Sequence, residues 1–431
     1  MPSGPHSARC RALALAAFVD ASPSPFHACA ETAARLERAG FRRIDETRAW
    51  PADVGRGYVS RASSLVAWAA PAARAAHTGF RVVAAHTDSP NLRVKARANT
   101  GQAGWRQLGV EVYGGALLNS WLDRDLGLSG RVMVRGKDGP EARLVLVDRP
   151  LLRVPQLAIH LDREVNTKGL VLDKQTHLQP VWGLGSVDEA GLETLLAAEL
   201  DCAPSDVLSW DLMLHDVQPS RLIGRDEELL SAPRLDNLCS SFCGLEALLE
   251  GLEDEREHLA VLCLFDHEEV GSSSTRGAGG PALRDVLERL VHAAGGSRED
   301  YHRAIAGSVC ISVDMAHATH PNYPERHEPR HRIAVNAGPV IKINTNQRYA
   351  SDAAGEALFQ SACEEAGVPF QKYFHRSNLA CGSTIGPLTA ARLGMQTVDV
   401  GTPQLSMHSA RELCGREDPE LLVRALRVLY R

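Results

Sequence analysis

Short apolar segments that fit buried strands alternate with helix-like segments at both ends of the chain, and this alternation limits the fold more than any other feature. A strand that is apolar at every position needs cover on both faces, which is typical of a sheet packed between helices. We therefore expect an α/β fold. The strand-like segments are Arg81–Ala85, His258–Phe265, Ser308–Val313, Val340–Asn344 and Gln396–Val400. The segments with helical spacing are Leu235–Leu252, Pro281–Ala294, Ala353–Ala366 and Thr384–Leu393.

The middle of the chain, from about residue 94 to residue 222, has a different pattern. Strand-like segments such as Leu128–Val134 and Ala142–Val147 look shorter here, and polar and apolar residues often alternate in them. Tyr113–Gly115 and Gly136–Gly139 are typical of turns. We expect a β-rich domain, residues 94–222, inserted into an α/β domain that residues 1–93 and 223–431 form together.

Length and charge limit the classes of partner. The 431 residues suffice for two domains with a large core. The net charge of −6 gives no electrostatic reason to expect nucleic acid or an anionic membrane as a partner. No apolar run approaches the roughly 20 residues that a membrane-spanning helix needs.

The N-terminal segment and the cysteines bear on the compartment. Arg9 and Arg11 precede an apolar run, Ala12–Val19, that faintly resembles a signal peptide, but Asp20 ends this run without a small-x-small cleavage pattern. We interpret the run as the first helix of a mature chain. The ten cysteines contain no C-x-x-C pair, which disfavours a thiolate zinc site. Scattered single cysteines favour a reducing compartment, the cytoplasm.

Histidine and acidic residues gather where predicted strands end or helices begin, and in open α/β sheets sites form outside the carboxyl ends of the strands. His86 leaves an apolar strand and Asp88 follows two residues later, a spacing that suits a histidine ligand and a carboxylate that orients it. The alternative is a capped strand end with a solvated aspartate. Asp236 lies at a helix start, where an aspartate is commonly a capping or first-turn acid.

The segment Asp266–Glu269 is more specific. Three carboxylates and a histidine follow a buried strand within four residues, and so much like charge is costly without a cation. One of two adjacent glutamates can bind a metal while the other acts as general base toward a water. A solvated run of charge is the alternative. Asp314 follows another apolar strand, and His408 stands just before a predicted helix.

These residues together make up a ligand set for two cations about 3.5–4 Å apart, with one bridging carboxylate. Nitrogen and oxygen ligands without sulfur suit Zn²⁺, and they also suit Co²⁺ or Mn²⁺. The set consists of His86, Asp236, Glu269, Asp314 and His408.

At this point the sequence resembles the aspartyl aminopeptidases of the M18 metallopeptidase family. The matching motifs occur in the family's order and extend over almost the whole chain. They are Ser24–Ala28, Ala85–Pro90, Leu157–Leu161, Pro233–Asn237, Glu268–Ser272, Asp314–His317, Gly338–Lys342, Gln347–Ser351 and Met407–Ser409.

The resemblance implies a phosphorylase/aminopeptidase-like fold, in which a mixed sheet is sandwiched by helices and carries an inserted β-rich dimerisation domain. It implies two metal positions that share Asp236 as a bridge. His86 and Asp314 would complete the first position, and Glu269 and His408 the second.

The resemblance also implies roles for five further residues. Asp88 would orient His86, and Glu268 would be the general base. His160 would reach the active site of a neighbouring subunit and contact substrate there, and His317 and Lys342 would contact substrate as well. Family members form homo-oligomers, as dimers and commonly as dodecamers, which would restrict access to peptides.

Lys342 is a lone cation in the apolar strand Val340–Ile343. Charged residues are rarely buried unless they are paired. A substrate carboxylate is one candidate partner and would explain a preference for N-terminal Asp or Glu. The alternatives are an internal carboxylate or a side chain that reaches solvent. The histidine-rich stretch His317–His331 has no tetrahedral ligand spacing, and we interpret it as a surface or inter-subunit loop.

The sequence thus predicts hydrolysis of the first peptide bond in peptides with N-terminal Asp or Glu. A first rival is another two-metal hydrolase, such as a deacylase or a carboxypeptidase-like enzyme, because the ligand set specifies metals and water rather than substrate. A second is a catalytically silent assembly or cargo scaffold, which a complete ligand set disfavours. A serine or cysteine hydrolase is disfavoured because no G-x-S-x-G motif occurs.

Overall fold

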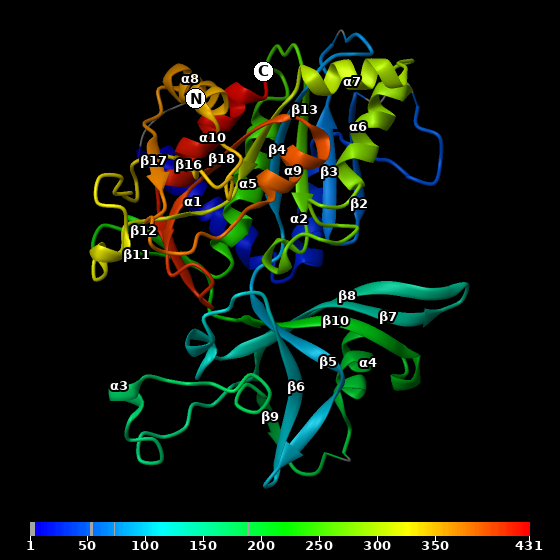
Figure 1. Ribbon diagram of the computed structural model, residues 1–431. Coiled ribbons are helices and arrows are strands. Elements are labelled where there is room, and N and C mark those ends of the chain that lie inside the picture. Colours follow the sequence, from blue (N-terminus) through cyan, green and yellow to red (C-terminus); the bar gives the residue numbers. More distant parts are fainter. Residues whose placement is uncertain (1–4, 52–54, 73, 188) are drawn as a thin grey trace. The chain divides into compact units, whose positions relative to one another are not determined.

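The computed structural model describes residues 5–51, 55–72, 74–187 and 189–431, which form two compact units (Figure 1). The first unit comprises Met1–Asp88, Ser220–Met407 and Glu412–Arg431, and the second comprises Ser89–Pro219 and His408–Arg411. The first unit combines helices with mixed sheets, whereas the second consists mainly of strands. The predicted α/β class is therefore confirmed.

A nine-stranded mixed sheet forms the centre of the first unit, counted over the described residues. Its strands are, in spatial order, β1 (Arg42–Arg43), β2 (Arg56–Arg61), β3 (Ser64–Ala69), β13 (Leu259–Phe265), β4 (Phe80–His86), β14 (Val309–Val313), β18 (Gln396–Gly401), β16 (Val340–Ile343) and β17 (Gln371–Phe374). The neighbours β13, β4, β14 and β18 run parallel to one another. Their carboxyl ends therefore meet at one edge, and all five predicted buried strands are confirmed.

Helices cover both faces of this sheet, as strands that are apolar at every position require. In β13, Leu262 and Leu264 pack into one core while Val261 and Cys263 pack into the other, in the two-residue period of a strand. The first core includes α1 (Pro5–Asp20), α2 (Pro25–Arg38), α5 (Leu235–Glu250), α8 (Ala353–Ala366) and α10 (Asp418–Leu429). The second core includes α6 (Ala282–Ala293), α7 (Arg298–Ala306) and α9 (Ile385–Leu393).

The N-terminal apolar run lies in α1, as predicted. Leu15 and Phe18 are fully buried in the first core. Arg11 lies 2.6 Å from a carboxylate oxygen of Glu246 and 2.9 Å from one of Glu420, so polar contacts also hold this helix to α5 and α10. No helix in the described ranges is long and apolar enough to cross a membrane.

A smaller five-stranded sheet in the first unit corrects one prediction. It consists of β11 (Arg221–Ile223), β12 (Leu229–Ala232), β20 (Glu412–Gly415), β19 (Pro403–Leu405) and β15 (Ala316–His317). The expectation that His408 directly precedes a helix is wrong, because β20 follows it and the next helix, α10, begins only at Asp418. The β20 strand is only four residues long and pairs with the distant β12 as well as with the nearby β19, so its own short pattern does not reveal it.

The second unit contains a six-stranded antiparallel sheet, whose strands are, in order, β8 (Gly139–Leu152), β7 (Leu126–Gly136), β10 (Val207–Asp216), β5 (Asn91–Gln102), β6 (Trp105–Tyr113) and β9 (Val181–Leu184). It also contains α3 (Val165–Lys168) and α4 (Leu192–Leu200). The expectation of short strands is wrong, since β5 has 12 residues and β8 has 14. Most of β8 is exposed, and its polar positions interrupt the apolar signal that would reveal its length. The turns at Tyr113–Gly115 and Gly136–Gly139 are confirmed.

Candidate metal centre

His86 is the last residue of β4 and is only 1% exposed. Its Nδ1 atom lies 3.0 Å from the backbone carbonyl oxygen of Asp88. Because a carbonyl oxygen only accepts hydrogen bonds, Nδ1 carries the proton and the lone pair of the neutral ring is on Nε2. Nε2 lies 3.4 Å from Asp236 Oδ1 and 3.7 Å from Asp314 Oδ1. The ring therefore offers Nε2 as a ligand between two carboxylates.

Asp236 lies at the start of α5, in a stretch where residues 236 and 237 depart from helical backbone angles. Its N–H donates to Glu412 Oε2 at 2.9 Å, and Asn237 Nδ2 donates to the carbonyl of Val313 at 2.8 Å. Val313 immediately precedes Asp314. These bonds join the start of α5 to the ends of β14 and β20. Asp236 thus faces buried partners instead of capping its helix in solvent.

The donor atoms of His86, Asp236 and Asp314 all lie within 4.8 Å of one another. The donor atoms of His86, Glu268 and Glu269 satisfy the same limit. Zinc ions in proteins bind imidazole nitrogen and carboxylate oxygen at about 2.0–2.2 Å. Buried nitrogen and oxygen donors at such mutual distances fit a zinc ion after small side-chain movements, so the residues present match the ion in chemistry.

Glu268 and Glu269 lie on a short 3₁₀ turn, Glu268–Val270, that follows β13. The backbone N–H of Glu268 donates to Asp88 Oδ1 at 3.1 Å, and that of Glu269 donates to Asp88 Oδ2 at 3.1 Å. Asp88 is fully buried, and its Oδ1 also lies 3.3 Å from His86 Nδ1. One carboxylate therefore holds both glutamates in place, while the backbone carbonyl of the same residue makes the closer contact with His86.

The site concentrates negative charge in a buried region. Burial and the neighbouring carboxylates of Asp314, Asp88 and Asp236 together raise the pKa of Glu268 to about 8, against the opposing effect of His86. Burial and the carboxylates of Asp236, Glu268 and Asp88 raise the pKa of Glu269 well above its usual range. Burial opposes the charged form of His86, yet the surrounding carboxylates raise its pKa well above the ordinary value. All three shifts show that the site favours added positive charge.

His408 lies in the loop that joins β19 to β20, and residues 408–411 of this loop group with the second unit. Both ends of the loop are held in the first unit, where Leu405 pairs with Leu413. Glu412, the first residue of β20, accepts the N–H of Asp236. The end of the loop that carries His408 is therefore connected to Asp236 through the hydrogen bond of Glu412.

Lys342 lies in β16 and is 2% exposed. Its Nζ atom donates to the carbonyl of Met315 at 3.2 Å and lies 3.7 Å from Asp314 Oδ2. The Tyr349 ring centre is 5.2 Å away, which adds a cation–π contact. The internal carboxylate that the sequence left as an alternative partner is therefore present. A cation bound at Asp314 would compete with Lys342 for that carboxylate.

The other two predicted substrate residues, His317 and His160, lie in different units. His317 ends β15, and its ring centre lies 6.1 Å from that of Tyr373 in β17. His160 is exposed in a turn of the second unit. The structure thus places Lys342 next to the predicted metal ligand Asp314. It places His317 beside the ring of Tyr373 in the same unit.

Sequence reasoning missed the residues that hold the ligands in place. Ser241 Oγ donates to the carbonyl of His86 at 2.8 Å, and Glu412, 2% exposed, binds the backbone of Asp236. Asn237 was visible as part of the motif that contains Asp236. Glu412 had no local signal, because its partner is 176 residues away in the chain.

Known proteins resemble this chain along almost its whole length. The profile of the family described as "Aminopeptidase I zinc metalloprotease (M18)" matches residues 18–430. "Probable M18 family aminopeptidase 2" of Streptomyces coelicolor is 57% identical over 415 residues, which cover 96% of this chain and 95% of that protein.

Two solved structures superpose closely. "Cryo-EM structure of the Ape4 and Nbr1 complex" aligns with a TM-score of 0.95 at 38% identity, over 98% of this chain and 86% of that one. "Structure of S. cerevisiae mApe1 dodecamer" aligns with a TM-score of 0.86 at 28% identity, over 99% of this chain and 97% of that one. With the family profile, these matches identify the activity as that of a metalloaminopeptidase, a hydrolase. The chain belongs to the M18 family of zinc aminopeptidases.

Proposed function

We propose that this aminopeptidase removes an N-terminal Asp or Glu from peptides, with two zinc ions per subunit and Glu268 as general base. The observation that carries the proposal is a buried lysine beside a buried metal site, since Lys342 Nζ lies only 3.7 Å from Asp314 Oδ2. A fixed cation next to the reacting bond is suited to a substrate with a carboxylate on its first side chain.

The proposed ligands divide into two groups that share Asp236. His86 and Asp314 would hold one ion, and Glu269 and His408 the other. Support comes from the short mutual distances of the donors of His86, Asp236 and Asp314, and from their burial. When bound, the ions supply Lewis-acid stabilisation of the scissile carbonyl and lower the pKa of water. Zinc fits these donors best, and Co²⁺ or Mn²⁺ would also bind them.

Glu268 would take a proton from the attacking water and deliver it to the leaving nitrogen. The adjacent residue, Glu269, is a proposed ligand, so the base sits one residue from the metal site. The Asp88 carboxylate fixes both backbone amides of this pair at 3.1 Å. Such a fixed position lowers the entropy cost of bringing the base to the water.

Lys342 would bind the side-chain carboxylate of the first substrate residue. Its burial makes an unpaired ammonium costly, and a cation on Asp314 weakens the pairing that it has within the chain. The Tyr349 ring, whose centre lies 5.2 Å from the ammonium, restricts where the ammonium can point. The ammonium is thereby held ready for a substrate anion.

The second unit supports a homo-oligomer. Leu157, Ile159 and Leu161 flank His160 and are 58%, 46% and 75% exposed. Exposed apolar side chains grouped on one loop favour coverage by another protein surface, here a second copy. We propose that the inserted β-rich domain mediates dimerisation, that His160 reaches a neighbouring site, and that dimers assemble into a dodecamer like that of the S. cerevisiae relative. The first unit would then be a phosphorylase/aminopeptidase-like sandwich.

The cysteines favour a cytoplasmic location. All ten are free thiols, and most of them are buried. Burial raises the pKa of Cys263 well above its ordinary value, which keeps that thiol protonated and inert. A chain with ten free thiols suits a reducing compartment.

Matched peptides with N-terminal Asp, Glu, Ala, Leu or Lys test the proposal. We expect rapid hydrolysis of the Asp and Glu peptides, loss of that activity with chelator, and recovery after Zn²⁺ or Co²⁺ is added. The measurement is kcat/KM for each peptide in each metal state, with acylamino acids included as deacylase substrates.

Other outcomes of this panel would change the proposal. If only the neutral peptides are hydrolysed, and chelator abolishes that activity, the chain is a metal-dependent aminopeptidase but the proposed preference for acidic residues is wrong. Preferential hydrolysis of acylamino acids would favour the deacylase rival. An intact, metal-loaded oligomer that hydrolyses none of these compounds would favour the scaffold.

Replacing Lys342 with Met should remove the acidic preference. A hydrogen bond to a charged group contributes about 1.5–3 kcal/mol, so we expect kcat/KM for the Asp peptide to fall by about 10- to 100-fold. The value for the Ala peptide should stay within a few-fold of wild type. Lys372→Met is the matched control, because Lys372 lies on the adjacent strand and pairs with Glu356. An equal loss on both peptides would mean that Lys342 supports structure only.

A further inference from the structure

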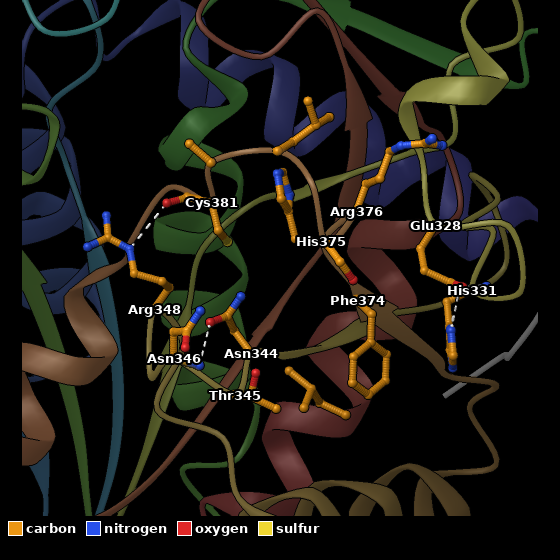
Figure 2. Close-up of a pocket in the computed structure, with 14 residues that line it drawn as sticks. Glu328, His331, Asn344, Thr345, Asn346, Arg348, Phe374, His375, Arg376 and Cys381 are labelled. Carbon is orange, nitrogen blue, oxygen red and sulfur yellow. Dashed lines mark hydrogen bonds and ion pairs between the residues drawn. The ribbon is translucent and has the colours of Figure 1, made fainter.

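A pocket of about 750 Å³ lies in the first unit, beside the strands that carry Lys342 and Tyr373. Figure 2 shows its lining, which comes from residues 328–331, 343–348 and 374–381. Ile343, Phe374 and Leu379 supply apolar surface, while Asn344 and Asn346 supply amide groups. A volume of this size and a mixed lining are typical of ligand sites.

The pocket carries more positive than negative charge. Arg348 and Arg376 line it from opposite sides (Figure 2), and neither forms an ion pair with a described residue. Arg348 donates through Nε to the carbonyl of Cys381 at 3.2 Å, and Arg376 donates through Nε to Asn378 Oδ1 at 2.8 Å and through Nη1 to the carbonyl of Glu325. Each guanidinium has five N–H donors, so both keep donors for a ligand.

The single carboxylate among the described lining residues is already engaged. Glu328 Oε2 accepts hydrogen bonds from the backbone N–H of Arg330 at 2.8 Å and from that of His331 at 2.6 Å, and it lies 2.6 Å from His331 Nδ1. Desolvation is the largest single effect and raises the pKa of Glu328, but these contacts together outweigh it and hold the pKa below its ordinary value. Glu328 thus brings one negative charge against two arginines, and its contacts are with the 330–331 segment, so the lining keeps an excess of positive charge.

A series of contacts through two tyrosines links the pocket to Lys342. The Tyr373 hydroxyl lies 2.7 Å from Nδ1 of His375, which lines the pocket. On the other side, the Tyr373 ring centre is 6.4 Å from that of Tyr349, whose ring contacts Lys342. These two tyrosines, which we call the tyrosine wall, thus connect the pocket to the lysine beside Asp314.

We propose that this pocket binds a carboxylate of the peptide substrate a few residues beyond the hydrolysed bond. The inference rests on the proposed function, because it extends the same bound peptide away from Lys342. An extended peptide advances about 3.3 Å per residue, so a few residues carry a downstream side chain past the tyrosine wall. Arg348 and Arg376 would pair with the carboxylate, and the apolar surface would contact the rest of the peptide.

Peptide binding to the zinc-loaded Glu268→Gln protein tests the pocket. The peptides begin with Asp, end in an amide, and carry one Glu or one Gln at the second, third or fourth position. We expect the Glu peptide to bind about three- to tenfold more tightly than its Gln counterpart at one of these positions, as for a partly exposed ion pair. This preference should shrink at high salt.

Arginine variants assign the preference to the pocket. Arg348→Gln and Arg376→Gln should each reduce the Glu/Gln ratio toward one, while Arg348→Lys should retain part of it. Arg392→Gln is the matched control, since Arg392 is exposed on α9 of the same unit and does not line the pocket. A Glu/Gln ratio of one in the parent protein, or a ratio that the pocket variants leave unchanged, would overturn the proposal.

Two further measurements separate the remaining outcomes. The first is binding of inorganic phosphate. If phosphate binds in the pocket but the protein shows no preference between the Glu and Gln peptides, the site belongs to a free anion and the peptide assignment is overturned. Hydrolysis of the same peptides by the wild-type protein reports on the proposed function independently. Hydrolysis with no Glu/Gln preference would contradict only the proposed role of the pocket. A Glu/Gln preference in binding without any hydrolysis would support the pocket and contradict the proposed reaction.

Discussion

Glu268→Gln is expected to lower kcat by about 10²- to 10⁴-fold, the usual contribution of a positioned general base. The amide has nearly the same shape as the carboxylate but cannot accept and return a proton. The backbone bonds from Glu268 and Glu269 to Asp88 do not involve the substituted group, so the turn should keep its position. The measurements are kcat for the best peptide and zinc content per subunit.

The control for this substitution is Glu255→Gln, which removes a carboxylate from an exposed loop of the same unit. It should leave both kcat and zinc content unchanged. Near-normal turnover in Glu268→Gln would remove Glu268 from the role of base. A loss of zinc together with activity would instead identify Glu268 as a metal ligand, in agreement with the short distances among His86, Glu268 and Glu269.

Asp236→Asn is expected to reduce bound zinc below the proposed two ions per subunit and to lower kcat/KM by more than about 100-fold. The substitution keeps the side-chain volume and removes one negative charge from the position that would bridge the ions. The Asp236 side chain is buried beside His86 and Asp314, so solvent cannot replace the lost charge. Elemental analysis of the purified variant, combined with kcat/KM at added zinc, measures both effects.

Asp138→Asn provides the matched control, because Asp138 is exposed at a hairpin tip of the second unit. Loss of both ions in Asp236→Asn would support the role of Asp236 as the ligand that bridges the two metal positions. Loss of only one ion would mean that Asp236 binds at one metal position only. Wild-type zinc content in the variant would contradict its assignment as a ligand.

The tandem glutamates were the part of the site that could be predicted best. Three acids after an all-apolar strand are improbable without a cation, and the structure places them after β13 at the edge where the parallel strands end. The buried strands were predictable for a related reason. A run such as His258–Phe265 has no polar face that could be exposed, so it needs helices on both sides.

Other features had no local signal. The β20 strand is short and pairs with a distant segment, and the pattern around His408 was misinterpreted as the approach to a helix. The length of β8 was hidden because charged residues and two prolines interrupt its apolar residues. In both cases the deciding interactions are hydrogen bonds to other strands, which the sequence of the segment does not contain.

The sequence by itself determined the α/β class, the buried strands and the residue types that suit a zinc site, because these depend on local periodicity and on the cost of burying charge. Only the tertiary structure decided which groups hold those residues in place. Asp88 binds two backbone amides of the glutamate turn, Glu412 binds the backbone of Asp236, and Tyr349 contacts Lys342. The contacts of Asp88 and Glu412 join segments that are far apart in the chain, whereas Tyr349 reaches Lys342 from the loop that follows the same strand, β16. In each case folding brings the groups together.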